Sequence, residues 1–233
     1  MTGHLNELSA AEPLTVDYYN SLGLLYASRQ KHLEATWAFQ KALDLDSGCA
    51  EAFYNQALSL TAQGRLDEAI DSYTNATRIR PDFQEAYYNL GNVLKKIGSI
   101  EKAIENYSVS LKLKPDFPEA YINLGNAYSQ QGLLDKAIKQ YLLALNINSN
   151  LPKAHHNLGA AYHSKGLLDK AIPEYLLALQ LKPEYPEVHH NLGVAYKTQG
   201  DTELAIIEFN NALRIRPGWE QPLKELEQMN IER

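Results

Sequence analysis

The chain has a single cysteine, no long apolar run and no excess of basic residues. Cys49 alone excludes an internal disulfide and a cysteine-based metal cluster. No stretch approaches the roughly 18 apolar residues of a membrane-spanning helix, and the N-terminus lacks the basic and apolar regions of a secretory signal. The 22 basic and 28 acidic residues give a formal charge of −6, opposite in sign to that of a typical nucleic-acid binder. These absences predict a cytoplasmic protein with no nucleic-acid and no membrane partner.

Glycine, in contrast, recurs at a fixed interval along most of the chain. Gly64, Gly98, Gly132, Gly166 and Gly200 follow one another every 34 residues. A period of 34 is typical of stacked helical hairpins rather than of one globular core. With these glycines at position 15 of the repeat, six repeats fit without a gap; they span 16–49, 50–83, 84–117, 118–151, 152–185 and 186–219. We number them repeats one to six, and residues within them positions 1 to 34.

Small and large residues occupy fixed columns of this repeat. Position 8 is glycine except for Ala57, position 7 is leucine except for Gln56, and position 20 is always alanine. Position 24 is always aromatic: Phe39, Tyr73, Tyr107, Tyr141, Tyr175 and Phe209. Positions 4, 7, 8 and 11 share one helical face, and positions 20, 24 and 27 share another. The pattern predicts two amphipathic helices per repeat, at about positions 1–14 and 18–31, which approach closely where small residues face large ones.

The residues between these predicted helices agree with the pattern. The position-15 glycine can adopt the left-handed conformation that ends the first helix. Acidic residues at position 18 and basic residues at positions 29 and 31 complement the dipole of the second helix. Proline at position 32 ends that helix in four repeats. Asp82 with Glu85, and Asp116 with Glu119, are expected to form capping boxes at the start of the next repeat.

The motif Asn-Leu-Gly-x-x-Tyr … Gly … Ala-Ile-x-x-Tyr … Ala-Leu resembles the tetratricopeptide repeat (TPR). Residues 118–151 carry it with Tyr121, Leu124, Gly125, Tyr128, Gly132, Ala137, Tyr141 and Ala144. The resemblance extends over residues 16–219 and implies an all-α fold, a right-handed α-solenoid of six tandem helix–turn–helix units. The array is also loosely similar to the TPR half of O-linked N-acetylglucosamine transferases and to consensus TPR designs. Residues 220–233 are expected to form a C-terminal capping helix, whereas residues 1–15 lack a clear frame.

The resemblance also indicates where a partner would bind. In TPR proteins the first helix of each unit lines a concave groove, which positions 2, 5, 6, 9, 12 and 13 face. Position 6 is asparagine in five repeats: Asn55, Asn89, Asn123, Asn157 and Asn191. An asparagine side chain donates and accepts hydrogen bonds, and in the transferase-type arrays such a ladder holds the backbone of an extended peptide. The alternative is that these asparagines bond within their own scaffold.

Neighbouring groove positions extend this candidate peptide-binding surface. Asn92 and Asn126 at position 9 widen the polar strip. Tyr54 and Tyr88 at position 5 add amphipathic surface suited to anchoring a partner. Position 2 is glutamate in four repeats, and for these residues a role in capping or in the helix dipole is the alternative to ligand contact.

Histidines are grouped in repeats five and six. His155 and His189, at position 4, are expected to replace an aromatic core residue. His156, His163 and His190 fall at groove positions, where protonation below about pH 6 would add positive charge. No cysteine or acidic residue completes a set of metal ligands around them, so the sequence predicts no metal and no cofactor.

These features predict a non-enzymatic scaffold whose groove binds an extended peptide segment of a partner protein. The sequence shows no glycine-rich phosphate loop and no paired nucleophile and base. Two alternatives stay open: the substrate-recognition region of a larger enzyme such as a glycosyltransferase, and a self-assembling or idealised array without a specific ligand. A monomer is expected, with self-association through the exposed Tyr18 and Tyr19 as the alternative.

Overall fold

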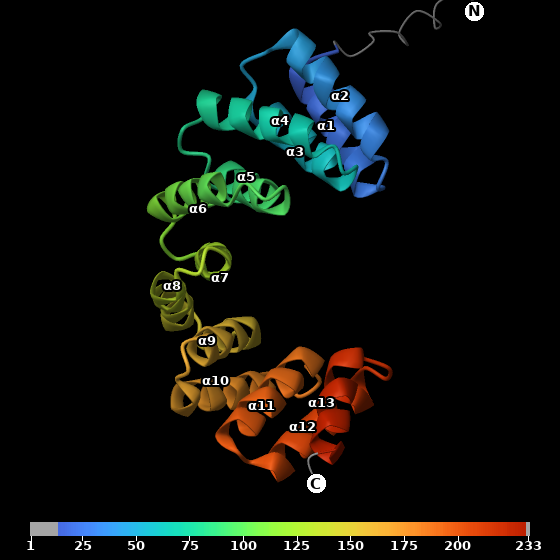
Figure 1. The fold of residues 1–233 in the computed structure, drawn as a ribbon. Coiled ribbons are helices and arrows are strands. Elements are labelled where there is room, and N and C mark those ends of the chain that lie inside the picture. The colour runs from blue at the N-terminus through green and yellow to red at the C-terminus, as the bar shows by residue number, and fades with distance from the viewer. Residues whose placement is uncertain (1–13, 232–233) are drawn as a thin grey trace, which may run out of the picture. The chain divides into compact units, whose positions relative to one another are not determined.

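The computed structural model describes residues 14–231, and every regular element in that range is an α-helix (Figure 1). The helices are α1 (Val16–Ser28), α2 (His32–Leu45), α3 (Ala50–Ala62), α4 (Leu66–Ile79), α5 (Gln84–Lys96), α6 (Ile100–Leu113), α7 (Pro118–Gln130), α8 (Leu134–Ile147), α9 (Pro152–Ser164), α10 (Leu168–Leu181), α11 (Pro186–Gln199), α12 (Thr202–Ile215) and α13 (Glu220–Ile231). None of these described helices is both long and apolar enough to cross a membrane. Most of the predicted N-terminal segment, residues 1–13, lies outside the described residues.

The chain divides into two compact parts, residues 1–106 and residues 107–233. In the first part, consecutive helices pack against one another in chain order from α1 to α5. In the second part, the same holds from α7 to α13. Each repeat supplies an odd-numbered helix, which we call its helix A, followed by an even-numbered helix B. Helices α2, α4, α8 and α10 each pack on the helix A of their own repeat and on that of the next repeat, which is the all-α solenoid arrangement that the sequence predicts.

The core of a repeat is built around a contact between a glycine of helix A and an aromatic ring of helix B. Tyr141 and Phe209, both at position 24, are 2% and 0% exposed. A methyl group built on Gly125 would lie 2.5 Å from the Tyr141 ring, and one on Gly193 would lie 2.7 Å from the Phe209 ring. These distances are well inside van der Waals contact, so a side chain at position 8 would displace the ring. The small residues at position 8 and the aromatic residues at position 24 therefore pack against each other.

The turn between helices A and B depends on the position-15 glycine. Gly64, Gly98, Gly132, Gly166 and Gly200 have φ angles between +74° and +95°. A Cβ at any of them would meet no atom within 4 Å, so the backbone conformation, and not lack of space, favours glycine there. This confirms the predicted left-handed end of helix A. Repeat one places Gln30 at the same position, with a φ of +59°.

The starts of helices A differ from the sequence prediction. The predicted capping boxes, Asp82 with Glu85 and Asp116 with Glu119, are wrong. The N-cap residues of α5 and α7 are the phenylalanines that follow the two aspartates, and neither helix has a side-chain cap hydrogen bond. Each aspartate therefore stands one residue too early to serve as the N-cap.

An aromatic residue takes the N-cap place because its ring is needed for packing. The ring of Phe83 lies 4.7 Å from that of Tyr54, measured between centroids. The guanidinium of Arg80, at position 31, lies 4.5 Å above the Phe83 ring. Arg216 covers Trp219 in the same way, at 4.7 Å. The aromatic residue at position 34 is thus held between a cation and the core, and this contact replaces a polar cap.

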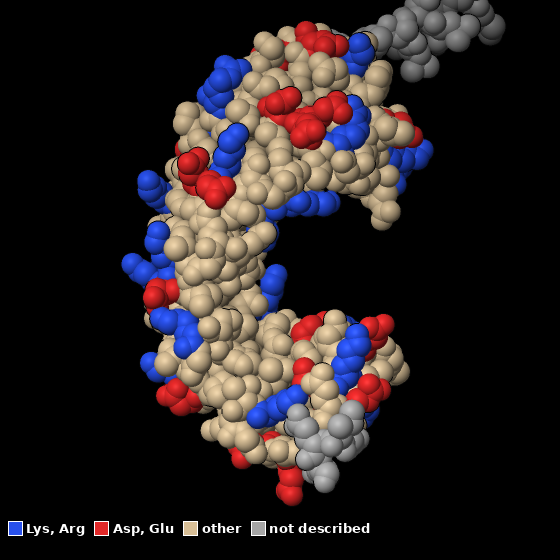
Figure 2. Space-filling model, in the orientation of Figure 1, with Lys and Arg blue, Asp and Glu red and all other residues tan. Residues whose placement is uncertain are grey.

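Helix α13 covers the apolar face at the end of the array. Met229 is 4% exposed and packs with Ala205 and Phe209 of α12, while Leu226 is partly buried against the same cluster. The ammonium group of Lys197 on α11 forms an ion pair with Glu225 of α13 at 3.0 Å. This helix therefore acts as the predicted capping helix. Charges of both signs are interspersed on the face of each part that Figure 2 shows.

Candidate functional site

The predicted asparagine row lies on helices A, and its amides bond to the preceding repeat. In the first part of the chain, Asn55 of α3 donates from Nδ2 to the side-chain oxygen of Asn20, at 3.2 Å. Asn89 of α5 donates to the hydroxyl oxygen of Tyr54, at 3.0 Å. Both acceptors occupy position 5 of the repeat before. One N–H of each amide therefore ties neighbouring helices A together, as the scaffold alternative expected.

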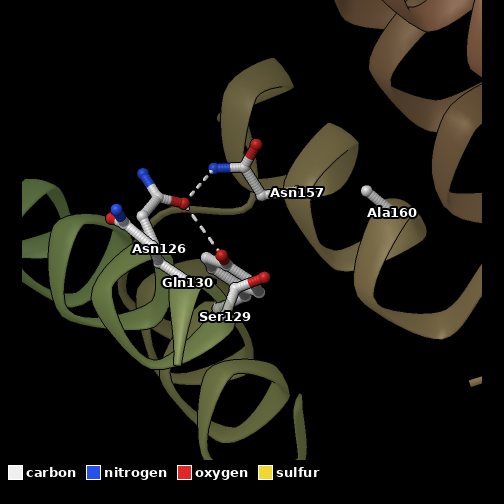
Figure 3. A pocket seen from close by; sticks show the side chains of 6 residues that line it. Asn126, Ser129, Gln130, Asn157 and Ala160 are labelled. Atoms are coloured by element: carbon white, nitrogen blue, oxygen red, sulfur yellow. Dashed lines mark hydrogen bonds between the residues drawn. The ribbon is translucent and has the colours of Figure 1, made fainter. Parts of the chain in front are cut away.

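The second part of the chain repeats this arrangement with different acceptors. Asn191 of α11 donates to Nε2 of His156 at 2.8 Å, and Asn157 of α9 donates to Oδ1 of Asn126 at 2.7 Å (Figure 3). The same oxygen of Asn126 accepts the Tyr141 hydroxyl at 2.8 Å. Asn123 of α7 is half-buried at the equivalent place, and so is Asn92 of α5 at position 9.

These bonds use only part of each amide. No residue between 14 and 231 donates a hydrogen bond to the side-chain oxygens of Asn55, Asn89, Asn157 and Asn191. Each of these amides also keeps a second N–H, since an asparagine carries two amide hydrogens. The four side chains are half-buried and so remain partly accessible. Each part of the chain thus presents oriented amides that still have an acceptor and a donor for a ligand.

A small hollow opens beside the amides of Asn126 and Asn157. It has a volume of about 290 Å³ and lies between α7 and α9 (Figure 3). Its lining consists of Asn126, Ser129, Gln130, Tyr141, Asn157 and Ala160. No charged side chain lines it, and amide and hydroxyl groups supply its polar atoms. Such a lining suits a neutral hydrogen-bonding group, of which a peptide backbone is the commonest example.

Of the predicted tyrosines, Tyr54 contributes more to packing than to open surface. Tyr54 is half-buried, with its ring against those of Phe83 and Tyr73, at centroid distances of 4.7 and 6.0 Å. Burial raises the pKa of the Tyr54 hydroxyl, and the charge of Glu85 adds to the rise. Tyr88 is half-buried at the same position of α5. The hydroxyl of Tyr54 holds Asn89 in place, so this tyrosine supports the asparagine row from behind.

Two of the four glutamates at position 2 make contacts within their own repeat. Glu51 forms an ion pair with Arg80, and Glu187 forms one with Arg216. These are the arginines that cover the aromatic residues at position 34 of the same repeats. Positions 2, 31 and 34 therefore contact one another at the end of a repeat, and the two paired glutamates have a structural role.

The two position-4 histidines bridge helices A and B through polar contacts. His189 has Nδ1 at 2.5 Å from a carboxylate oxygen of Glu208 and Nε2 at 3.0 Å from the Pro183 carbonyl oxygen. His155 makes the same contacts with Glu174 and with the Ser149 carbonyl, at 2.6 and 3.0 Å. Both histidines are 9% exposed. The sequence prediction placed them correctly in the core but missed these bonds.

A sequence signal for these bonds existed. Position 23 is glutamate only in repeats five and six, the two repeats with histidine at position 4. The structure shows that positions 4 and 23 meet across the helix pair. Neither the period nor the amphipathicity of a sequence shows which pairs of positions touch. The contact between positions 4 and 23 therefore could not be predicted from them.

Two of the three histidines at predicted groove positions, His156 and His190, lie among aromatic rings. His156 lies against Tyr185 and Tyr175, at centroid distances of 5.2 and 6.2 Å. Burial lowers the pKa of His156, and the Glu187 carboxylate offsets this only in part. Burial also lowers the pKa of His163 and of His190. Charging of these imidazoles therefore needs a more acidic pH than usual, and the described residues contain no group of three metal-binding side chains.

Comparison with known families and structures agrees with this geometry. Residues 57–98, 96–132, 130–166 and 161–200 match a family model described as TPR repeat, and residues 186–219 match one described as tetratricopeptide repeat. No curated protein has a sequence that matches this one.

Several solved structures share the fold. YrrB, described as a TPR protein with an unusual peptide-binding site, is 23% identical with a TM-score of 0.70, over 82% of this chain and 98% of that one. MamA protein is 28% identical, with a TM-score of 0.67 over 71% of this chain and 91% of that one. Cut9, from a Cut9–Hcn1 hetero-tetramer, is 25% identical with a TM-score of 0.72, over 94% of this chain and 43% of that one. With matched repeats from residue 57 to residue 219 and helix pairs of this geometry, the chain belongs to the tetratricopeptide repeat family.

Proposed function

We propose that the chain is a non-enzymatic scaffold that holds an extended peptide segment of a partner protein against the asparagine row. TPR proteins are generally interaction modules rather than catalysts, which supports the coarse part of this proposal. The observation that carries the finer part is the state of the amides. In four members of the row, one N–H is fixed by the preceding repeat while an oxygen and a second N–H remain unbonded within residues 14–231.

Fixed amides favour binding because their orientation is set before the ligand arrives. A free asparagine side chain would lose rotational freedom on binding, and that loss weakens affinity. Here the bonds to Asn126 and to His156 already hold Asn157 and Asn191 in place. A peptide in an extended conformation presents its C=O and N–H groups at regular intervals to such amides.

The lining of the hollow between α7 and α9 supports recognition of the peptide backbone. Its amide and hydroxyl groups carry no charge, so nothing there selects a charged side chain. We therefore expect a neutral segment to bind here, with little dependence on ionic strength. YrrB and Cut9, which share the fold, are described with a peptide-binding site and with a bound protein partner, respectively.

The test is a selection of peptides from a random twelve-residue library, followed by affinity measurements on variants. Asn157→Ala together with Asn191→Ala removes two amides of the row, and we expect binding to weaken roughly tenfold or more. Asn210→Ala is the matched control, because the one hydrogen bond of this exposed α12 asparagine within residues 14–231 goes to the Ile206 carbonyl of its own helix. Peptides that bind the double variant and wild type equally well, with helicity unchanged, would contradict the proposal.

A further inference from the structure

A second hollow lies in the first part of the chain, away from the asparagine row. It has a volume of about 540 Å³, and α2, α3 and α4 surround it. Its lining consists of Leu33, Thr36, Trp37, Gln40, Gln56, Leu60, Arg65, Glu68, Asp71 and Ser72. No member of the asparagine row is among these residues. A ligand here would therefore contact helices B, whose outer side the proposed peptide-binding role does not use.

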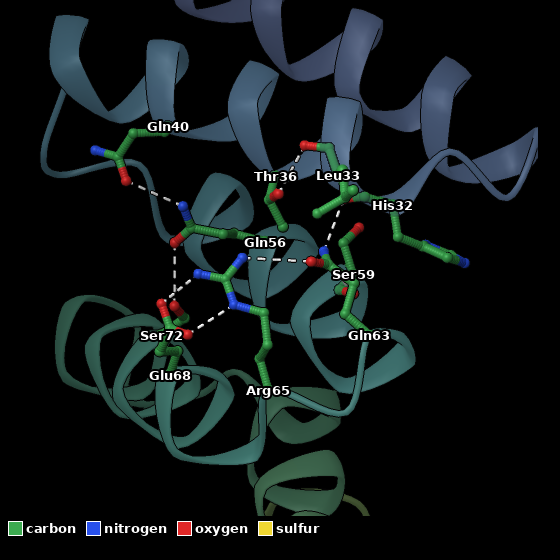
Figure 4. Close-up of polar contacts among 10 residues, drawn as sticks. All are labelled: His32, Leu33, Thr36, Gln40, Gln56, Ser59, Gln63, Arg65, Glu68 and Ser72. Carbon is green, nitrogen blue, oxygen red and sulfur yellow. Dashed lines mark hydrogen bonds and ion pairs between the residues drawn. The ribbon is translucent and has the colours of Figure 1, made fainter.

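The floor of this hollow is polar because one repeat departs from the pattern. Gln56 stands where all other repeats have leucine, and it is 9% exposed. Its oxygen accepts the hydroxyl of Ser72 at 3.0 Å, and its Nε2 donates to Gln40 at 3.1 Å (Figure 4). Gln40 in turn donates to Asp44 at 3.0 Å. This connected chain satisfies the buried glutamine and links α2, α3 and α4 beneath the hollow.

One wall of the hollow is apolar and open to solvent. Trp37 is 51% exposed and Leu33 is 68% exposed, although both are large apolar residues of α2. The Trp37 ring has an edge contact with Tyr19, at 6.1 Å between centroids, which leaves much of the indole uncovered. An exposed tryptophan beside a leucine on the rim of a hollow is typical of a recognition surface.

The opposite wall carries a net negative charge. Arg65 is bound by both oxygens of Glu68, at 2.7 Å from Nε and 2.5 Å from Nη2, so these two charges cancel (Figure 4). Asp71 has no ion pair or hydrogen bond with any residue between 14 and 231. Its carboxylate is therefore the one uncompensated charge of the lining, and acidic side chains gather over α4 in Figure 2.

Trp37 and Asp71 occupy position 22 of repeats one and two, so they stand at corresponding places on α2 and α4, and both line the hollow. We infer that this hollow is a second docking site, which takes an arginine side chain and the apolar residues beside it from a partner polypeptide. A guanidinium stacks flat on an indole and pairs with a carboxylate through the same planar group. The adjoining apolar residues pack against Leu33, which is exposed. Acidic segments are repelled by Asp71 and find no free cation, because Glu68 already holds Arg65.

The first experiment uses the fluorescence of Trp37. The chain has two tryptophans, so Trp219→Phe leaves Trp37 as the single reporter. The probe is the peptide acetyl-Ser-Leu-Arg-Leu-Ser-amide, compared with versions in which citrulline or glutamate replaces the arginine. We expect a saturable change in Trp37 emission with the arginine peptide, at least roughly tenfold weaker binding with citrulline, and none with glutamate. No saturable change up to about 1 mM arginine peptide, or equal binding of the citrulline peptide, would overturn the inference.

Variants assign the binding to this hollow and use a fluorescein-labelled arginine peptide on the otherwise unchanged chain. Asp71→Asn is expected to weaken binding roughly tenfold, because it removes the uncompensated charge. Leu33→Ser is expected to weaken it as well, whereas Leu45→Ser should not. Leu45 is a matched control, since it is 54% exposed on the same helix and does not line the hollow.

The asparagine-row variant separates this inference from the proposed function. Asn157→Ala with Asn191→Ala should leave arginine-peptide binding unchanged, because neither residue lines the hollow. If that variant abolishes binding while Asp71→Asn and Leu33→Ser do not, the arginine peptide occupies the asparagine row and the second site does not exist.

Discussion

At the scale of single residues, the contact between helix A and helix B leaves no room for a methyl group. Gly125→Ala would place a Cβ 2.5 Å from the Tyr141 ring, which is 2% exposed and cannot move into solvent freely. Overpacking of this kind costs about 1–3 kcal/mol, while alanine gains about 1 kcal/mol of helix propensity over glycine. We expect the free energy of unfolding to fall by roughly 1 kcal/mol, as measured by urea denaturation. A rise in stability would show that the ring can shift without loss.

His189 provides a prediction for pH. Burial lowers the pKa of its imidazole, but the hydrogen bond to Glu208, the Pro183 carbonyl and the Glu208 charge together raise it above the ordinary value of 6.5. Both ring nitrogens face acceptors, so the doubly protonated form satisfies both. Because the folded-state pKa is raised, the stabilisation is fully present below about pH 6.5 and is lost as pH rises through the folded-state pKa.

The variant His189→Gln isolates this contribution from that of the other histidines. We expect the stability difference between wild type and His189→Gln to be larger at pH 6 than at pH 8, measured by urea denaturation at several pH values. Wild type alone is a poor test, because the lowered pKa values of His156, His163 and His190 act in the opposite direction. A difference that grows with pH would contradict the assigned contacts.

Some residue contacts could be predicted from the sequence and others could not. The close approach of position 8 to position 24 follows from side-chain size alone, since a column of glycine needs a column of large rings to fill the space. The bond of Asn89 to Tyr54, by contrast, joins residues of different repeats. The geometry of this bond depends on the distance between the helices A of successive repeats. Neither the period nor the polarity of the sequence predicts that distance.

At the scale of elements, helix ends depend on backbone conformation more than on polar caps. The position-15 glycine was predictable because few other residues adopt a left-handed φ readily. The aromatic N-cap at position 34 was not, because tertiary packing there replaces the local preference for aspartate or serine. The predicted boxes at Asp82 and Asp116 were wrong for this reason.

Gln30 provides a test of how the left-handed backbone conformation at the end of helix A affects stability. It takes the place of glycine at the end of α1 with a φ of +59°, a conformation that favours glycine. Gln30→Gly is expected to raise the free energy of unfolding by about 0.5–1 kcal/mol, after allowance for the greater freedom of glycine in the unfolded chain. Gly132→Gln is the reverse change in repeat four and should lower stability by a comparable amount. Unchanged stability in both variants, measured by urea denaturation, would mean that this turn carries no strain.

At the scale of the whole molecule, the repeat architecture was predictable and the positions of its hollows were not. Because the pattern occurs six times, a residue that differs in one repeat does not obscure it. The all-α solenoid can therefore be predicted from the positions that most repeats share. The two hollows depend on repeat positions at which the residue type differs between repeats. Gln56 replaces a leucine and lines the hollow between α2 and α4. Ala160, beside the hollow between α7 and α9, stands at position 9, which is leucine, asparagine, alanine or valine in different repeats. A residue that differs from the others at its repeat position marks a local difference in packing. Whether a hollow forms there depends on the residues of the neighbouring repeat that pack against it.

Because each repeat contacts mainly its neighbours, a change at one end should act locally. Met229 of α13 is 4% exposed and fills the space against Ala205 and Phe209. Met229→Ala removes this contact, which we expect to cost about 2 kcal/mol and to loosen α13 together with α11 and α12. Hydrogen exchange should therefore speed up in these three helices and stay unchanged in α3 and α4. Leu223→Ala is the matched control, since Leu223 is 40% exposed on the same helix and should alter exchange little. Faster exchange spread evenly over all helices would show that the array unfolds as one cooperative unit instead of repeat by repeat.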